Sequence, residues 1–112
     1  MVVRKGGEVE IVPLIHLLYI EARGSYSRIC YEKEGKQQEA VMSYSVAEYE
    51  DMLPDELFFR LHKSYLVNCM HLDHLTKDAQ PVLKLKGNQE IPVSRRRYPE
   101  LLRFLQTKFR HG

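Results

Sequence analysis

The chain has 112 residues, of which 44% are hydrophobic and 29% are charged, and its formal net charge is +2. This length suits one domain with a single modest core, and no apolar run approaches the roughly 20 residues that a membrane span requires. The basic N-terminal residues 1–7 lack the apolar segment of a secretory signal peptide. Cys30 and Cys69 form no CxxC motif, so we expect reduced thiols in a cytoplasmic protein.

The first 42 residues predict strands joined by short turns. The Val and Ile residues of segment 2–12 are interrupted by Gly6-Gly7, and Pro13 ends this segment. In segment 26–31 alternate residues would face opposite sides, with Tyr26, Arg28 and Cys30 on one and Ser27, Ile29 and Tyr31 on the other. Strands are expected at residues 2–12, 19–22, 26–31 and 38–42, with turns at Gly24-Ser25 and at residues 32–36.

The second half predicts two helices around further strands. Ser43 or Ser45 can cap a short helix that ends at Pro54, and Glu48 lies at capping-box distance from Ser45. Ser94 can cap a final helix. Extended segments are expected at 71–75, 82–85 and 90–93, with a two-residue hairpin turn at Gly87-Asn88 and helical apolar spacing at Tyr98, Leu101, Leu102, Leu105 and Phe109. The predicted fold is mainly β, with antiparallel strands, a short central helix and a C-terminal helix.

The stretch from Phe58 to Asn68 places cationic and hydroxyl side chains between two apolar runs. Phe58 and Phe59 precede Arg60, His62 and Lys63, and the apolar run 65–67 follows Ser64. This pattern indicates a rigid support that presents polar groups at a bend. A nucleic-acid reader needs such a platform, because its side chains must reach base edges from fixed positions.

The net charge of +2 conceals an uneven distribution along the chain. Residues 32–59 carry eight acidic and two basic side chains, a balance of −6, whereas residues 60–112 carry eleven basic and four acidic ones, a balance of +7. Residues 1–31 contribute the remaining +1. The basic part is suited to an anionic partner, although solvated charge without a partner would give the same pattern.

Three predicted turns carry polar groups that a core does not require. Consecutive arginines at a helix N-terminus oppose the macrodipole, which favours a role in binding an external anion, and arginine can also grip the guanine edge. Each turn has a plainer explanation: a hydrated hairpin for the first, a packed histidine for the second and a solvated helix end for the third. The candidate DNA contacts are Arg23, Ser25, Ser27 and Arg28 in the first turn, His62, Lys63 and Ser64 in the second, and Arg95, Arg96 and Arg97 in the third.

The sequence gives no indication of catalysis, of a cofactor or of a metal site. Ser64 lies near His62, but no acidic residue is placed to orient the histidine and no glycine-rich elbow frames the serine. His71 and His74, three residues apart on a predicted strand, would point to opposite faces and could not ligate a metal together. We therefore expect a protein that is not an enzyme.

Three motifs follow one another along the chain: Tyr19-Ile20-Glu21-Ala22 followed by Gly24-Ser25-Tyr26, the run from Phe59 to Asn68, and Ile91-Pro92-Val93-Ser94-Arg95-Arg96. Together they resemble the LytTR-type DNA-binding domain of bacterial transcriptional regulators, from about Val9 to Phe109 within a single domain of residues 1–112. The resemblance implies an elongated antiparallel β fold that reads double-stranded DNA through loops, at paired direct repeats in promoters. It also implies a homodimer on DNA and a receiver or sensor module elsewhere in the full regulator of a two-component system.

Carried onto this sequence, the family contacts fall on Ser25 and Ser27, on Lys63 beside His62, and on Arg96 with Arg95. We expect Lys63 and Arg96 to enter major grooves. The arginines expected to bind phosphates are Arg23, Arg28, Arg95 and Arg97. This hypothesis requires that the three turns lie on one side of the molecule. The alternative is a protein-interaction or sensory β-module that uses the acidic segment 32–56 as its contact surface.

Overall fold

A computed structural model describes residues 1–77 and 79–108, so the predicted helical position Phe109 lies outside the described residues. The molecule is elongated, with extents of 46 × 29 × 24 Å, and mainly β, as predicted. In chain order its elements are β1 (Val2–Lys5), β2 (Glu8–Ile11), the 3-10 helix η1 (Leu14–His16), β3 (Leu17–Arg23), β4 (Tyr26–Lys33), β5 (Lys36–Met42), α1 (Val46–Met52), β6 (Phe58–His62), β7 (Tyr65–Asn68), the 3-10 helix η2 (Cys69–His71), β8 (Leu72–Lys77), β9 (Pro81–Leu85), β10 (Glu90–Pro92) and α2 (Tyr98–Lys108).

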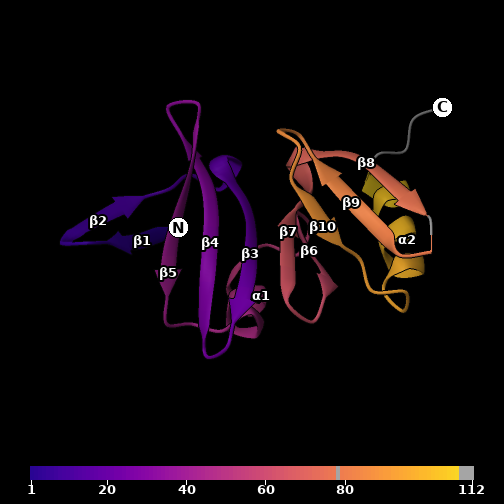
Figure 1. Cartoon of the computed structure of the whole chain (residues 1–112), viewed down its shortest axis with the longest axis horizontal. Coiled ribbons are helices and arrows are strands. Elements are labelled where there is room, and N and C mark those ends of the chain that lie inside the picture. Colours follow the sequence, from indigo (N-terminus) through magenta and orange to yellow (C-terminus); the bar gives the residue numbers. More distant parts are fainter. Residues whose placement is uncertain (78, 109–112) are drawn as a thin grey trace.

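The strands form one central sheet and two smaller ones, all antiparallel (Figure 1). The central sheet has the order β5-β4-β3-β7-β6, the C-terminal sheet has the order β10-β9-β8, and β1 pairs only with β2. Two-residue turns join β1 to β2, β3 to β4, β4 to β5 and β6 to β7, whereas β3 pairs with β7 across a long separation in sequence. This non-local pairing joins strands from the two halves of the chain in one sheet. No described helix is long and apolar enough to cross a membrane.

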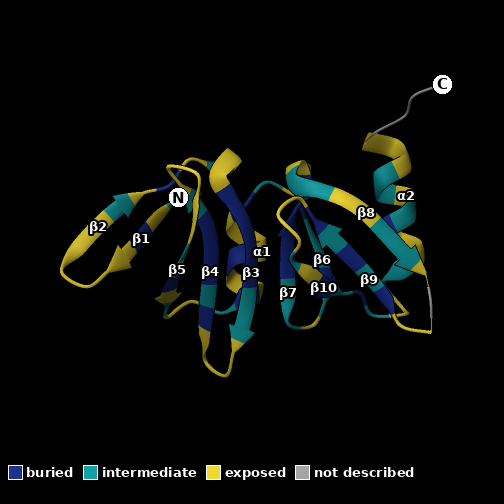
Figure 2. Ribbon diagram, turned by 45° about the horizontal axis from the view of Figure 1, so that its top comes forward, coloured by how far each residue is buried: buried dark blue, intermediate teal, exposed yellow. Residues whose placement is uncertain are grey.

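The central strand β3 is covered on both faces (Figure 2). Its residues Leu17 and Ile20 belong to one buried cluster, which we call core 1, and Leu18 and Tyr19 belong to a second, core 2. The register of β3 against β4 shifts between Leu17 and Tyr19, which lets two successive side chains face the same core. A strand buried on both faces explains the continuous apolar run in this part of the sequence.

Core 1 is closed by the short helix α1 and by β1. Val46 and Tyr49 of α1 and Val3 of β1 are buried against the central sheet. The helix begins after Ser45, whose side chain accepts from the backbone N–H of Glu48, while the Glu48 side chain accepts from the N–H of Ser45. The predicted capping box is therefore confirmed, with Ser45 as the cap.

Core 2 lies between the central sheet, the C-terminal sheet and α2. Leu83, Leu85 and Ile91 come from the C-terminal sheet, and Leu101 of α2 is fully buried. Phe59 of β6 packs against Phe104 of α2 with ring centroids 5.1 Å apart. Both cysteines are buried as free thiols, and burial raises the pKa of Cys69 to about 12.

The predicted hairpin at Gly87-Asn88 forms, but the prediction of a two-residue turn is wrong. The Leu85 N–H donates to Gln89 O at 2.9 Å, which leaves three residues in the loop, and the Asn88 N–H donates to Leu85 O at 3.1 Å. Asn88 adopts the left-handed conformation, with φ 74°. Gly87 before it also has a positive φ, 96°, and three-residue loops are the next most common hairpin connection after the two-residue turn.

Candidate nucleic-acid interface

The three predicted turns lie along one edge of the molecule, as the DNA-binding hypothesis requires. Figure 1 shows the β3–β4 turn, the β6–β7 turn and the loop after β10 along the lower edge. The Ala22 N–H donates to Ser64 O at 2.8 Å, which joins the first turn to the second. The Ser94 N–H donates to Leu61 O at 2.9 Å, which joins the second to the third. The edge is therefore a single hydrogen-bonded structure.

The first turn presents Arg23 and Ser25 to solvent. Arg23 pairs with Tyr26 across the hairpin, and Gly24 between them has φ 62°, a conformation that L side chains rarely adopt. The Arg23 side chain is 60% exposed although its Nε donates to Glu21 at 2.9 Å. Ser25, at the tip, is exposed. Both residues can reach a ligand that approaches this edge.

The structure contradicts the assignment of Ser27 as a DNA contact. Ser27 has no exposed surface, and its hydroxyl donates to Tyr44 O at 2.6 Å. A side chain on this face of β4 packs in core 1, so Ser27 could touch DNA only if the strands separated.

Arg28 lies on the other face of β4 from Ser27, with its guanidinium bound within the protein. It donates to Glu21 at 2.8 Å, to Glu39 at 2.6 Å and to the Tyr19 hydroxyl at 3.2 Å, and its side chain is 18% exposed. These bonds fix Arg28 within the sheet, and its two carboxylate partners offset its positive charge.

The second turn holds His62 inward and leaves Lys63 outward. His62 Nδ1 accepts from the Ser64 N–H at 3.1 Å, and its ring meets the Tyr65 ring edge-on at 5.8 Å between centroids. Thus His62 orders the turn itself, in agreement with its plainer explanation. Lys63 is exposed, and its ammonium has no hydrogen-bond or ion-pair partner among the described residues.

A β-bulge at Leu61 sets the direction of the second turn. Arg60 pairs with Leu66 and His62 pairs with Tyr65, so Leu61 is an extra residue in β6. Its side chain is buried in core 2, and its carbonyl accepts the Ser94 N–H. The bulge therefore connects the turn to the loop after β10.

The third turn precedes α2 and is capped by Ser94. The Arg97 N–H donates to Ser94 Oγ at 3.2 Å, and the Tyr98 N–H donates to Ser94 O at 3.1 Å. Arg95 donates to Ala79 O at 2.6 Å, and Arg97 pairs with Glu100 at 3.5 Å. Arg96 is exposed and has no partner for its side chain in the part of the chain that the structure describes.

The second and third turns share one hollow of about 330 Å³. Four of its lining residues were predicted contacts, and Ser94 was predicted as a helix cap. Arg60 was missed as a site residue. The sequence signal that could have found it is an arginine in the strand that leads into the turn, between the buried residues Phe58 and Leu61. The lining residues are Arg60, His62, Lys63, Ser94, Arg96 and Arg97.

The Glu21 carboxylate links the first turn to the second, because it accepts hydrogen bonds from Arg23 and from Tyr65. Its environment leads us to expect a pH dependence of stability. Burial raises the pKa of Glu21, but hydrogen bonds from Tyr65, Arg23 and Arg28 outweigh burial and hold the pKa below its usual value of 4.5. A lowered folded-state pKa stabilises the protein above the unfolded-state value, and this stability is lost as pH falls through the folded-state pKa. Between pH 5 and pH 3 the parent should therefore lose more unfolding free energy than Glu21→Gln.

Urea unfolding at half-unit pH intervals measures this difference. The control is Glu90→Gln, which removes an exposed carboxylate and should leave the pH curve of the parent unchanged. Parallel curves for the parent and Glu21→Gln would contradict the role given to Glu21.

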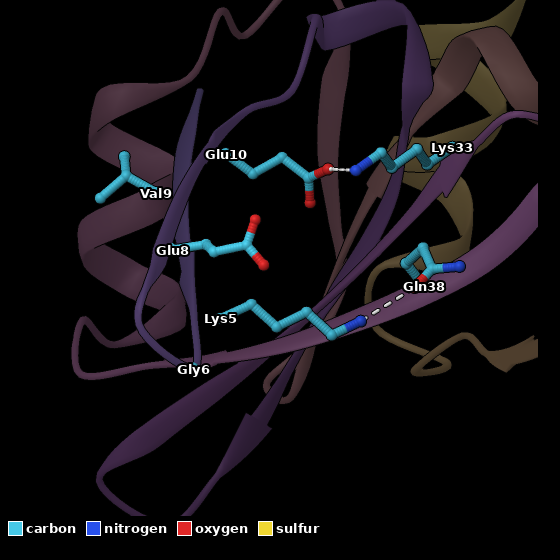
Figure 3. Close-up of a pocket in the computed structure, with 7 residues that line it drawn as sticks. All are labelled: Lys5, Gly6, Glu8, Val9, Glu10, Lys33 and Gln38. Carbon is cyan, nitrogen blue, oxygen red and sulfur yellow. Dashed lines mark hydrogen bonds and ion pairs between the residues drawn. The ribbon is translucent and has the colours of Figure 1, made fainter.

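A second hollow, of about 460 Å³, lies between the β1–β2 hairpin and the β4–β5 hairpin (Figure 3). Lys5 donates to Gln38 at 2.8 Å across it, and Lys33 pairs with Glu10, which also accepts from the Tyr31 hydroxyl at 2.6 Å. Because the Lys5–Gln38 bond and the Lys33–Glu10 ion pair cross this hollow, it is a polar junction that attaches the hairpin to the sheet. Among the described residues no cluster of three or more His, Cys, Asp or Glu could hold a metal ion.

Comparison with known proteins agrees with this geometry. The family model of the LytTR DNA-binding domain matches residues 7–106. Among solved structures, the LytTR DNA-binding domain of a protein described as a methyl-accepting/DNA response regulator from Bacillus cereus superimposes with a TM-score of 0.83 and 23% identity, covering 94% of each chain. At this identity the likeness shows the shared fold. Comparison with curated proteins finds no match. Because the family model spans most of the sequence, the chain belongs to the LytTR DNA-binding domain family.

Proposed function

We propose that this domain binds specific DNA sequences as the output domain of a bacterial transcriptional regulator. The observation that carries the proposal is the arrangement of the three turns along one edge, where Lys63 and Arg96 extend into solvent. Base readout needs side chains that are free to bond and a backbone that is fixed. The hydrogen bonds between the turns provide the fixed backbone.

In this proposal the exposed cations divide into two roles. Lys63 and Arg96 enter major grooves and donate to base edges, for which guanine O6 and N7 are the commonest acceptors. Arg23, Arg95 and Arg97 already make contacts within the protein, and they keep N–H groups that can donate to phosphates. Phosphate contacts set the register of the protein on the duplex, and the two base contacts supply the sequence preference.

The wider setting belongs to the same proposal. We infer that the domain serves a two-component system in the cytoplasm, together with a receiver or sensor module. Paired direct repeats would be occupied by two copies on one duplex. The elongated shape, 46 Å in its longest dimension, supports this setting, because it lets one copy span more than one turn of B-DNA, about 34 Å.

Selection of bound duplexes from a random pool, followed by titration at two salt concentrations, tests the function. We expect enrichment of one motif and a log–log salt slope of about −0.9 for each phosphate contacted. Arg95→Gln should reduce the magnitude of the slope by about one and weaken binding to all sequences alike. The absence of an enriched motif, or binding that does not change with salt, would contradict the proposal and favour the protein-interaction module.

A further inference from the structure

We propose that Arg60 is a positioning residue for DNA recognition, which fixes the β6–β7 turn so that Lys63 meets its base in one orientation. This inference rests on the proposed function and deepens it, because it assigns a role to a side chain of β6 that none of the family motifs marks as a contact. The evidence is the pattern of bonds made by the Arg60 guanidinium.

Each nitrogen of the Arg60 guanidinium has a partner within the protein. Nε donates to His62 O at 3.0 Å, and Nη2 donates to Lys63 O. Nη1 donates to Glu50 Oε1 of α1 at 2.8 Å. The side chain is 16% exposed. The guanidinium lies against the backbone of the β6–β7 turn, which comes after Arg60 in the chain.

These bonds add to the pairing of His62 with Tyr65 that closes the turn. The Ser64 carbonyl is fixed by the Ala22 N–H of β3. The carbonyls of His62 and Lys63 both accept from the Arg60 guanidinium. With both carbonyls bound by one planar group, the peptide planes on either side of Lys63 cannot rotate independently. The backbone at Lys63 is therefore ordered before DNA arrives, which lowers the entropy cost of binding.

The same pattern distinguishes Arg60 from a phosphate contact. Arg96, across the shared hollow, is exposed and has no partner for its side chain among the described residues. Arg60 is largely covered, and its charge is paired with Glu50. A lysine at this position would keep the charge, but its ammonium cannot reproduce the planar fork that binds two carbonyls and a carboxylate together.

A double-mutant cycle between Arg60→Lys and Lys63→Ala tests the proposal, with affinity measured on the selected duplex. We expect Arg60→Lys to weaken binding about 5- to 30-fold with an unchanged salt slope, because the charge is conserved. The loss of affinity caused by Lys63→Ala should then be at least 3-fold smaller in the Arg60→Lys background than in the parent, because a misplaced Lys63 ammonium contributes less to binding. The control Arg103→Lys, on the exposed surface of α2, should leave affinity unchanged.

If Arg60→Lys does not fold, as judged by thermal unfolding, Glu50→Gln replaces it in the same cycle, since it alters only the third partner of the guanidinium. A cycle in which the two effects simply multiply would overturn the positioning role. So would a salt slope that falls by about one in Arg60→Gln, since that is the signature of a phosphate contact. If the parent selects no duplex, both the proposed function and this inference are contradicted. If the parent binds its duplex but the two substitutions show no coupling, this inference alone is contradicted.

Discussion

Replacing Lys63 and Arg96 together by alanine is expected to lower the affinity for the selected duplex by about 30-fold to about 10⁴-fold. Each side chain, if it bonds a base edge, contributes ~1–3 kcal/mol of discrimination. Lys63 lies in the turn 63–64 and Arg96 in the turn 95–97. If the two side chains contact separate base pairs, the two losses should nearly add. The double variant should retain weak binding that no longer distinguishes the selected duplex from random DNA.

Titration of selected and random duplexes at one salt concentration measures this loss. The matched control is Lys36→Ala with Lys86→Ala, which removes two charges from the opposite edge, where the Gln89 side chain meets Gln37. Because the net charge changes equally, the control isolates position from charge. It should lose affinity by no more than a few-fold, and equally for both duplexes. A control that matched the double variant would show that overall charge, and not the turns, determines binding.

Replacing Asn68 by aspartate is expected to lower the free energy of unfolding at pH 7 by about 3 kcal/mol or more, the largest effect on stability that we foresee from a single substitution. Asn68 has no exposed surface. Its Nδ2 donates to Leu14 O at 2.9 Å and to Leu17 O at 2.8 Å, and its Oδ1 accepts from the Met70 N–H at 2.9 Å. A carboxylate cannot donate to the two carbonyls, and each buried group that loses its partner costs about 1–3 kcal/mol.

Urea unfolding at constant pH measures this effect, and Asn88→Asp is its control. Asn88 is exposed in the β9–β10 loop, and aspartate tolerates its left-handed backbone conformation. The control should therefore change the unfolding free energy by less than about 0.5 kcal/mol. Equal changes in the two variants would mean that the Asn68 bonds do not hold η1 and β3 to the end of β7.

Hydrophobic alternation and turn chemistry were sufficient to predict most of the strands and the positions of the three turns. The glycine at position 24 and the capping box at Ser45 are local signals, set by neighbours in the chain. The hairpin at 87–88 was located correctly, but its loop length was predicted wrongly. Turn residues such as glycine and asparagine suit two-residue and three-residue loops alike, and the pairing of Leu85 with Gln89 decides between them.

The burial of Ser27 and the bonds of Arg60 could not be predicted, because each depends on residues distant in sequence. Alternation along β4 separates Ser27 from Arg28, yet it does not show which face carries a core. The hydroxyl of Ser27 is bound by Tyr44, 17 residues away, and Arg60 is bound by Glu50 of α1. A bulge such as that at Leu61 shifts the register by one residue and leaves no mark in composition.

Lys63 and Arg96 are exposed, whereas the side chains that support their turns are buried. If these two residues read bases as proposed, the target preference can be changed without affecting folding. Neither side chain contributes to core 1 or core 2, so a library randomised at these two positions should consist largely of folded members. Each member would inherit the same scaffold and display a different pair of chemical groups. The domain thus offers a starting point for engineered regulators whose DNA target can be chosen.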